Sequence, residues 1–548
     1  MIIAPILARL FSKKNVIFLI IVLAIALRLC SLGSIPGSLN IDETTIGYNS
    51  YSFLLTGKDE YGATMPLAYK SFGDWKLSGY PFASMLPIKL FGLNAFAVRL
   101  PSALAGIAQV ILMYFIGRLL FKRYSIALLA TLFYAISPWS IYFSRIAYEA
   151  NLATAFLLAG IYTFLVGIVH KRSGLFIFTA IFFGLTVFIY HSYIISMPLF
   201  MIALIIIYRQ QLPRNKLTYC AVIIFFLLIS LSLYAVSKQS IAKFSNLSVF
   251  NSPNIVYNRT DIFRTDHAPD IPILSRLIYN KFAASFYQSA QNYLATFSPQ
   301  FLFDTGGISL MGSLGYFGLF YIVDALFLLT GVIAFIFQRE KWLPFFIAWV
   351  AIAAIPSAIT VDAPSSTRLI MILPIFILIS AYGASSLLTF LRKQRFGILL
   401  GGFIVAVFLW NIFLFLDGYF IHMNYVRAIF QHYGYQQAVK LANKYPSYRV
   451  VMVGPDNFPY VSFLFYNQYD PYKFRQEVEY YPNDGNQFIL VKKFDRYEFP
   501  KTLNYNKLAP NTLYFDRSKP NKQILTQLKT SGTIKTPNGT VIFWYFIK

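Results

Sequence analysis

The chain has 548 residues, of which 57% are hydrophobic, 18% aromatic and only 13% charged, and its formal net charge is +25. A soluble globular protein carries about 25% charged residues, so this composition excludes an ordinary soluble domain and favours a chain solvated by lipid. The Lys and Arg residues are scattered between apolar runs, which argues against nucleic acid as a partner. The only two cysteines, Cys30 and Cys220, exclude a disulfide framework.

The first apolar run follows a basic stretch, as in a signal peptide, with Arg9, Lys13 and Lys14 preceding residues 15–32. No small-residue cleavage pattern comes after it, and further apolar runs do. We therefore interpret this run as an uncleaved first membrane span.

Eleven apolar runs are predicted to cross the bilayer, because a helix needs roughly 20 apolar residues to do so. They are residues 15–32, 98–120, 125–142, 151–169, 174–190, 193–208, 217–236, 311–337, 342–360, 368–390 and 397–416. The predicted fold class is therefore an α-helical polytopic membrane protein.

Short basic clusters mark every second gap between these runs and fix the predicted orientation, because cytoplasmic loops are enriched in Lys and Arg. The clusters are Lys13/Lys14, Lys122/Arg123, Lys171/Arg172, Arg209/Arg214/Lys216, Arg339/Lys341 and Arg392/Lys393/Arg395. We expect a multi-pass protein of the plasma membrane with a cytoplasmic N-terminus and an extracytoplasmic C-terminal domain.

The predicted domains are a transmembrane domain, residues 1–416, with long outer loops at 33–97 and 237–310, and a C-terminal domain, residues 417–548. Strand-like runs at 448–453, 488–493 and 541–548, with helical patterns at 432–445 and 459–467, predict a small α/β fold for the C-terminal domain. The polar residues gather in the outer loops rather than inside the spans. This distribution favours a site at the outer membrane interface over a transport path through the bilayer.

Two acidic pairs lie in the first outer loop, within "NIDETTIGYNSYSFLLTGKDEYG" (residues 40–62). The stretch after Asp42 and Glu43 is predicted to form an amphipathic interfacial helix, with Asp42 just before it. Asp42 could then simply cap that helix. Asp59 and Glu60 stand between two glycines, so a solvated turn is the plain alternative for them.

Cations are also predicted on the outer side. Arg145 and Glu149 are four residues apart at a span junction, which predicts one shared helical face, and Arg368 begins the run 368–390. The alternative for such cations is that they extend to lipid headgroups.

These segments, with "FGLNAFAVRLPSALAG", "SRIAYEANLATAFLLAG" and "STRLIMILP", resemble the GT-C class of polyprenyl-phosphate-sugar-dependent glycosyltransferases. The branch is that of the protein mannosyltransferase-like, aminoarabinose transferase-like and RgtA/B/C/D-like enzymes. The resemblance implies two interfacial helices in the first outer loop and an outer soluble domain. It also implies transfer of a sugar from a polyprenyl-phosphate carrier to a lipid, glycan or protein acceptor, with inversion at the anomeric carbon.

The resemblance and the chemistry together assign roles. Asp42 matches the family's catalytic carboxylate and would act as general base, with Glu43 as the local alternative. The candidates for binding the leaving phosphate are Lys70, Arg145, Arg368 and His191, and those for substrate positioning are Glu149, Asp59, Glu60 and Trp75. No cofactor is expected to be required. A divalent metal stays open, although the sequence does not indicate one.

Three other functions stay open. An oligosaccharyltransferase typically carries a Trp-Trp-Asp signature in its soluble domain, whereas the tail here has only Trp544. A lipid-linked-sugar flippase or transporter would show polar residues at the bilayer midplane and repeated halves. A non-catalytic envelope assembly protein would need none of these side chains.

Overall fold

The computed structural model describes residues 13–237, 247–252, 278–307, 315, 317–482, 488–520, 528 and 530–548. The chain forms two compact units that are not contiguous in sequence. Unit 1 comprises Met1–Cys30, Leu104–Ser144 and Glu149–Leu416, and unit 2 comprises Ser31–Ala103, Arg145–Tyr148 and Asp417–Lys548. The first loop, residues 33–97, therefore belongs to the same unit as the C-terminal domain.

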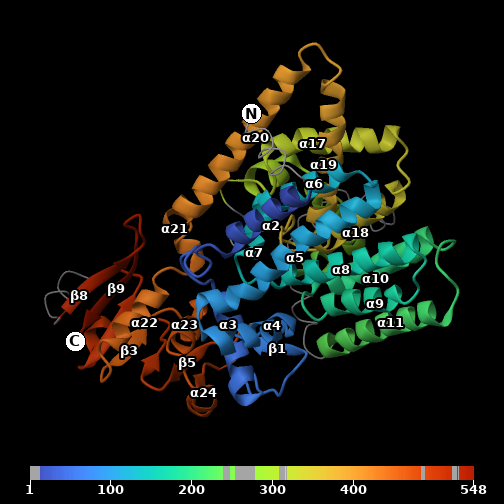
Figure 1. Ribbon diagram of the computed structural model, residues 1–548. Helices are drawn as coiled ribbons and strands as arrows, with labels where there is room; N and C mark the ends of the chain where they lie inside the picture. The colour runs from blue at the N-terminus through green and yellow to red at the C-terminus, as the bar shows by residue number, and fades with distance from the viewer. Residues whose placement is uncertain are drawn as a thin grey trace, which may run out of the picture. The chain divides into compact units, whose positions relative to one another are not determined.

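Unit 1 is built from helices, most of them apolar (Figure 1). They are α2 (Lys13–Leu29), α6 (Tyr124–Ile136), α7 (Pro138–Ser144), α8 (Glu149–Val169), α9 (Leu175–Thr186), α10 (Ser192–Ile207), α11 (Lys216–Ser237), α16 (Lys281–Ala295), α17 (Ile322–Phe337), α18 (Leu343–Ala358), α19 (Ile372–Leu391) and α20 (Gly397–Asp417). Two short turns of helix lie at Val249–Asn251 and Phe301–Thr305. Helix α5 (Ala95–Phe121) begins in unit 2 and continues into unit 1.

Each of the eleven predicted spans overlaps at least one of these helices, and residues 311–314 and 316 of the predicted span 311–337 lie outside the described residues. Within the described part of the chain, five helices are long and apolar enough to cross a membrane, namely α5, α8, α11, α19 and α20. A sixth span results if α6 and α7 count as one, although they bend by 54° at Pro138, which cannot continue a helical hydrogen-bond ladder. The membrane-helical fold is thus confirmed, while the count of eleven spans stays a prediction.

Small residues let the helices of unit 1 approach closely. A Cβ atom on Gly383 of α19 would lie 2.0 Å from the carbonyl oxygen of Phe327, and one on Gly331 of α17 would lie 2.2 Å from that of Ile379. Glycines at such crossings are typical of helix packing inside membranes, where van der Waals contact replaces the hydrophobic drive.

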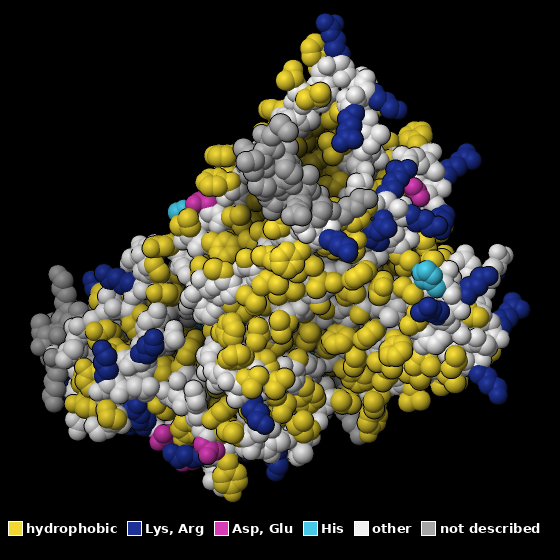
Figure 2. All heavy atoms as spheres, in the orientation of Figure 1, with side chains coloured by type: hydrophobic (Ala, Val, Ile, Leu, Met, Phe, Trp, Pro, Cys, Tyr) yellow, Lys and Arg dark blue, Asp and Glu magenta, His cyan; other side chains and the backbone are white. Residues whose placement is uncertain are grey.

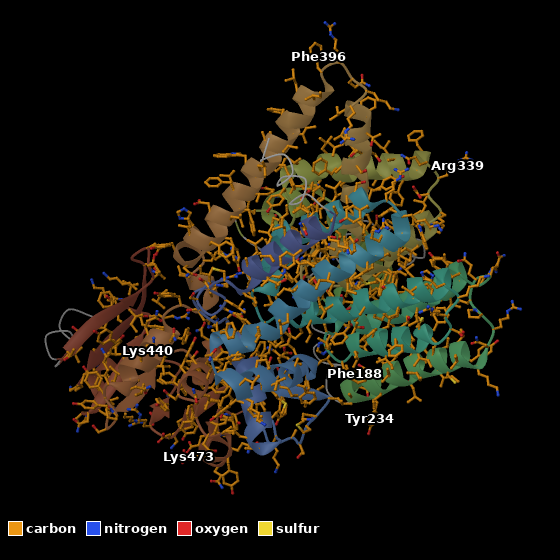
Figure 3. The ribbon with its side chains drawn as sticks, in the orientation of Figure 1. Phe188, Tyr234, Arg339, Phe396, Lys440 and Lys473 are labelled. Atoms are coloured by element: carbon orange, nitrogen blue, oxygen red, sulfur yellow. The ribbon has the colours of Figure 1, made fainter. Side chains whose placement is uncertain are left out.

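The surface of unit 1 separates apolar and basic residues. Figure 2 shows hydrophobic side chains over the helices and Lys and Arg side chains near helix ends. Arg339 lies at the turn between α17 and α18. Phe188, just after the C-terminal end of α9, and Tyr234, near the C-terminal end of α11, lie away from it (Figure 3). The basic residues that mark alternate gaps are all exposed where their side chains are described. This arrangement is the one expected of helices that cross a bilayer.

Unit 2 contains a seven-stranded mixed sheet of order β4-β5-β6-β3-β7-β9-β8. The central strand β3 (Arg449–Met452) is parallel to both its neighbours, and the remaining pairs are antiparallel. The other strands are β4 (Glu479–Tyr480), β5 (Val491–Phe494), β6 (Tyr497–Glu498), β7 (Thr512–Asp516), β8 (Thr530–Lys535) and β9 (Val541–Ile547). The helices of this part are α21 (Met423–Val426), α22 (Tyr435–Asn443), α23 (Pro459–Tyr466) and α24 (Pro471–Glu477). The predicted strands at 448–453 and 541–548 and both predicted helices are confirmed, and the predicted strand at 488–493 is confirmed only from Val491 on.

The first loop contributes α3 (Ile41–Thr56), a hairpin of β1 (Ala68–Ser71) and β2 (Asp74–Leu77), and α4 (Gly79–Phe91) to unit 2. Both helices implied by the resemblance are therefore present. The prediction that α3 is amphipathic is wrong, because residues on all of its faces are buried. Tyr48 of α3 belongs to the same hydrophobic core as the C-terminal sheet, and a Cβ atom on Gly47 would lie only 2.4 Å from the ring of Phe465. Helix α3 is thus a core element of unit 2.

Candidate functional site

Asp42 lies in the first turn of α3. The prediction that it precedes this helix is wrong, and so is the alternative that it caps the helix, since Asn40 is the N-cap and accepts a hydrogen bond from the Glu43 amide at 2.9 Å. The Asp42 side chain is instead 39% exposed and forms a salt bridge with the ammonium group of Lys76. Capping by a neighbour thus leaves this carboxylate available to a partner from outside its helix.

Lys76 is a buried cation that the sequence did not single out. Its ammonium group pairs with Asp42 and lies 4.9 Å from the centre of the Phe72 ring. Strand register explains why Lys76 and not Lys70 reaches Asp42. Tyr69 pairs with Lys76 and Lys70 pairs with Trp75, so the two lysines point to opposite faces of the hairpin.

Glu43, the alternative base, is engaged on both of its oxygens. Arg99 of α5 donates from Nε to Oε1 at 2.8 Å and from Nη2 to Oε2 at 3.1 Å. The Ala147 amide donates to Oε1 at 3.0 Å, and the Asn40 amide donates to Oε2 at 3.1 Å, closing a capping box. Both side chains are buried. This geometry favours a structural role for Glu43.

Arg99 extends this contact into a clamp, by which we mean Glu43, Arg99 and the segments that they hold. The remaining hydrogens of the Arg99 guanidinium reach the carbonyl oxygens of Leu32, Pro36 and Ser38 at 2.8–3.1 Å. All five donors of a fully buried arginine are therefore used. The clamp joins the chain before α3, the first turn of α3, helix α5 and the segment 145–148, and so fixes the backbone that carries Asp42.

Arg145 is fully buried in unit 2. It donates to the Ile35 carbonyl at 2.9 Å, and its guanidinium lies 4.8 Å from the Phe420 ring centre and 5.6 Å from that of Tyr419. The prediction that Arg145 and Glu149 share a helical face is wrong. Helix α7 ends at Ser144 and α8 begins at Glu149, so a non-helical segment separates the two.

The second acidic pair is not solvated, which corrects the simple alternative. Asp59 is 1% exposed, and its Oδ1 accepts from the amides of Tyr61 and Ala63, so it shapes a turn. Burial raises the pKa of Asp59. Glu60 is also 1% exposed, and burial raises its pKa to about 8.

The other face of the hairpin carries an aromatic group around Lys70. The Lys70 ammonium lies 5.5 Å from the ring centre of Tyr61 and 5.9 Å from that of Trp75. Tyr61 stacks on Tyr480 of β4 with centroids 6.0 Å apart. Lys70 and Trp75, predicted to serve phosphate binding and substrate positioning, thus lie together but on the face away from the Asp42 pair.

His432 is a further titratable neighbour of Asp42 in unit 2. Burial and the cationic Arg517 lower the pKa of His432 to about 4, and the Asp42 carboxylate opposes that shift. Its ring stacks on Tyr435 with centroids 5.3 Å apart. A neutral imidazole therefore lies in the electrostatic field of Asp42 at physiological pH.

Unit 1 holds the remaining candidates. Arg368 donates to Asp362 at 2.6 Å and to the hydroxyl of Thr360 at 3.2 Å. Tyr190 lies in the electrostatic field of both Arg368 and Glu149, and His191 follows it at the start of α10. Arg368, Glu149 and His191 are thus all neighbours of Tyr190, the first two through their charges and His191 through the chain.

Within the described residues, no group of three or more His, Cys, Asp or Glu side chains is placed to hold a metal ion.

The sequence analysis did not single out Lys76 and Arg99, although Arg99 stands in a segment that carried the resemblance. The signal for Lys76 was weak, since Lys70 and Lys76 flank the turn between β1 and β2 and only strand register separates them. Arg99 offered a stronger signal. An arginine near the outer end of an apolar run is expensive there and needs a partner, which is Glu43.

Part of the chain matches a described protein family. Residues 79–234 match the family model described as dolichyl-phosphate-mannose-protein mannosyltransferase. The matched range begins at α4 and includes Arg99 and Arg145. No curated protein matches the chain in sequence.

Solved structures share the fold. The archaeal oligosaccharyltransferase AglB from Archaeoglobus fulgidus, in complex with an inhibitory peptide and a dolichol-phosphate, matches with a TM-score of 0.50 and 12% identity. The match covers 84% of this chain, which spans 64% of the length of that protein. ArnT from Cupriavidus metallidurans bound to undecaprenyl phosphate matches with a TM-score of 0.49 and 12% identity, over 84% of this chain and 86% of that one.

Both kinds of comparison lead to glycosyltransferases. The family model covers the helices that follow the hairpin, and the fold of the archaeal enzyme covers most of the chain. The family model thus bears out the predicted resemblance to the GT-C glycosyltransferases over residues 79–234, and the archaeal structure shows a shared fold.

Proposed function

We propose that this chain is a membrane glycosyltransferase that moves a sugar from a polyprenyl-phosphate carrier to a hydroxyl group of an extracytoplasmic acceptor. The match of residues 79–234 to the mannosyltransferase family and the GT-C fold support the reaction class. The dolichol-phosphate named with the archaeal enzyme supports a lipid phosphate as the carrier. The acceptor class stays a lipid, glycan or protein.

The observation that carries the proposal is the accessible carboxylate of Asp42 on a rigid, buried support. Its side chain is 39% exposed, whereas Glu43 beside it is held by Arg99 and two amides. A general base must be held in a fixed place and reach the acceptor proton. Among the two carboxylates of the first pair, only Asp42 meets both conditions.

The reaction would proceed in one displacement. Asp42 takes the proton of the acceptor hydroxyl. At the same time, the oxygen of that hydroxyl attacks the anomeric carbon from the side opposite the phosphate. The bond between that carbon and the phosphate oxygen breaks, and polyprenyl phosphate leaves with the electron pair. The configuration at the anomeric carbon is thereby inverted, as in inverting glycosidases, with the acceptor in place of water.

Lys76 is placed to serve both ends of this reaction. Lys76 pairs with Asp42, and its positive charge would also attract a phosphate oxygen bound beside this pair. A bound phosphate would draw the ammonium away from Asp42 and leave the carboxylate a stronger base. Arg145, buried in the same unit, would add positive charge for the leaving group. Arg368 stays a separate candidate in unit 1.

We further propose the plasma membrane as the location, with the N-terminus in the cytoplasm and unit 2 outside. The alternation of exposed Lys and Arg between the apolar helices supports this orientation.

Reconstitution tests the proposal. The purified chain in proteoliposomes would receive radiolabelled polyprenyl-phosphate sugars together with lipid, oligosaccharide or peptide acceptors. We expect label on one acceptor class. Translocation of the labelled lipid across the bilayer without transfer would favour a flippase, and the absence of both activities with every donor would favour an assembly protein.

A further inference from the structure

Glu60 is a buried carboxyl group that the proposed reaction does not use. Its Oε1 accepts from the Phe72 amide at 3.2 Å and from the Tyr460 hydroxyl at 3.3 Å. Within the described residues, its Oε2 is buried and has no hydrogen-bond partner. An unpartnered, buried carboxylate oxygen is costly when charged. The protonated form of Glu60 is therefore favoured by its surroundings.

Phe72 connects Glu60 to the pair formed by Asp42 and Lys76. Its backbone amide binds Glu60, and its ring lies 4.9 Å from the ammonium group of Lys76, which pairs with Asp42. The charge of Lys76 favours ionisation of Glu60 and opposes the effect of burial. Lys76 thus has a second carboxyl group within its field besides Asp42.

Other titratable and charged groups surround Glu60 from every element packed around it. Asp59 precedes it, and its negative charge disfavours ionisation of Glu60. Arg475 of α24 donates to the Asp59 carbonyl at 3.1 Å. Within the described residues, the other titratable groups that interact with Glu60 are phenols from α3, the loop, α23 and β4, namely Tyr48, Tyr61, Tyr460 and Tyr480. Among the described groups, Lys76 is the cation whose charge favours ionisation of Glu60.

We propose that Glu60 is a positioning residue that competes with Asp42 for Lys76 and so sets how strongly this lysine neutralises the base. The proposal rests on the proposed function, in which Asp42 takes the acceptor proton. A protonated Glu60 leaves Lys76 to Asp42 alone. An ionised Glu60 attracts the same ammonium, and the Asp42 carboxylate becomes less neutralised and more basic.

The consequence is a rise in sugar transfer with pH. Since burial raises the pKa of Glu60 to about 8, the rise falls near that pH, which is above the titration range of ordinary carboxyl groups. Glu60→Gln keeps the size of the side chain but cannot ionise. We expect its transfer rate to stay flat where that of the wild type rises.

The first experiment compares transfer rates of the reconstituted protein from pH 6.5 to about pH 9. The wild type should show a several-fold rise with a midpoint near pH 8, and Glu60→Gln should lack it. Glu477→Gln makes the same chemical change at a partly exposed carboxylate of unit 2 that lies 3.7 Å from Lys473, and should behave as the wild type. An unchanged rise in Glu60→Gln would overturn the proposal.

A second experiment needs no activity and separates this proposal from the proposed function. Unfolding temperatures would be measured across the same pH range for the wild type and Asp42→Asn, each against its Glu60→Gln counterpart. The difference within each pair reports the titration of Glu60. Asp42→Asn releases Lys76 toward Glu60, so the midpoint should move below pH 8. Equal midpoints in the two backgrounds would overturn the proposal, whether or not the protein transfers sugar.

Discussion

Arg99 grips Glu43 through two parallel hydrogen bonds, from Nε to Oε1 at 2.8 Å and from Nη2 to Oε2 at 3.1 Å, with both side chains buried. This pair is the centre of the clamp that fixes the start of α3. The carboxylate that the account needs for chemistry, Asp42, is the residue immediately before Glu43. Removing the clamp should therefore affect both stability and transfer.

Arg99→Met should destabilise the protein by about 3–5 kcal/mol, because it leaves the Glu43 carboxylate buried without its cation. Arg449→Met is the matched control. It breaks a more exposed pair with Glu498 and should cost no more than about 1 kcal/mol. Thermal unfolding of the detergent-solubilised proteins gives both values. Equal losses in the two variants would show that the clamp contributes no more than a surface ion pair.

Lys76→Gln should lower the transfer rate by about 100-fold, since it removes a charge-assisted donor from the reacting groups. Lys70→Gln is the control on the opposite face of the same hairpin, and we expect less than about a threefold change from it. The measurement is the initial rate of transfer by equal amounts of reconstituted protein. A larger loss in Lys70→Gln than in Lys76→Gln would contradict this prediction and place the phosphate on the face of the hairpin that carries Lys70.

Glu60 should make stability depend on pH. Its pKa is about 8 in the folded protein against 4.5 for an ordinary Glu, so between these values the folded state holds a proton that the unfolded state has lost. Stability should therefore fall as pH rises through this window, by up to about 1.4 kcal/mol per pH unit. Glu60→Gln should remove that slope in thermal unfolding, and Glu477→Gln should keep it. A slope that survives in Glu60→Gln belongs to another group.

The orientation yields a topology prediction. A reporter that is active only outside the cytoplasm, fused after Lys548, should be active, and the same reporter inserted after Arg395 should be silent. The opposite pattern would show that the orientation in the membrane is reversed, with unit 2 in the cytoplasm.

Much of the fold could be predicted from local composition. Every predicted apolar run overlaps a helix. In an apolar environment no water is present to bond the backbone groups, so they must bond to each other within the run. Helix lengths were harder to predict, and the structure ends α9 at Thr186 and breaks the third run at Pro138. The junction at 145–148 shows why. Two residues four apart share a face only if the helix continues between them, and here it does not.

The part of the candidate site that a local sequence pattern marks was predicted. The part that depends on contacts between segments distant in sequence was missed. The acidic pair after the first run pointed to Asp42, and the resemblance gave it a role. The partners of that pair come from β2 and α5, and neither contact is visible in a local pattern. Helix α3 looked interfacial because its pattern is mixed, yet the C-terminal domain covers it and gives it a place in a core.

The central claim is that Asp42 takes the acceptor proton, and the most direct measurement is the transfer rate of Asp42→Asn beside Asp495→Asn. Asp495 is the matched control, since its side chain is 37% exposed against 39% for Asp42 and it also lies next to a lysine, Lys473. We expect a loss of at least about 100-fold for Asp42→Asn, the usual contribution of a general base, and a near-normal rate for Asp495→Asn. A folded Asp42→Asn protein that transfers sugar at the wild-type rate would contradict it.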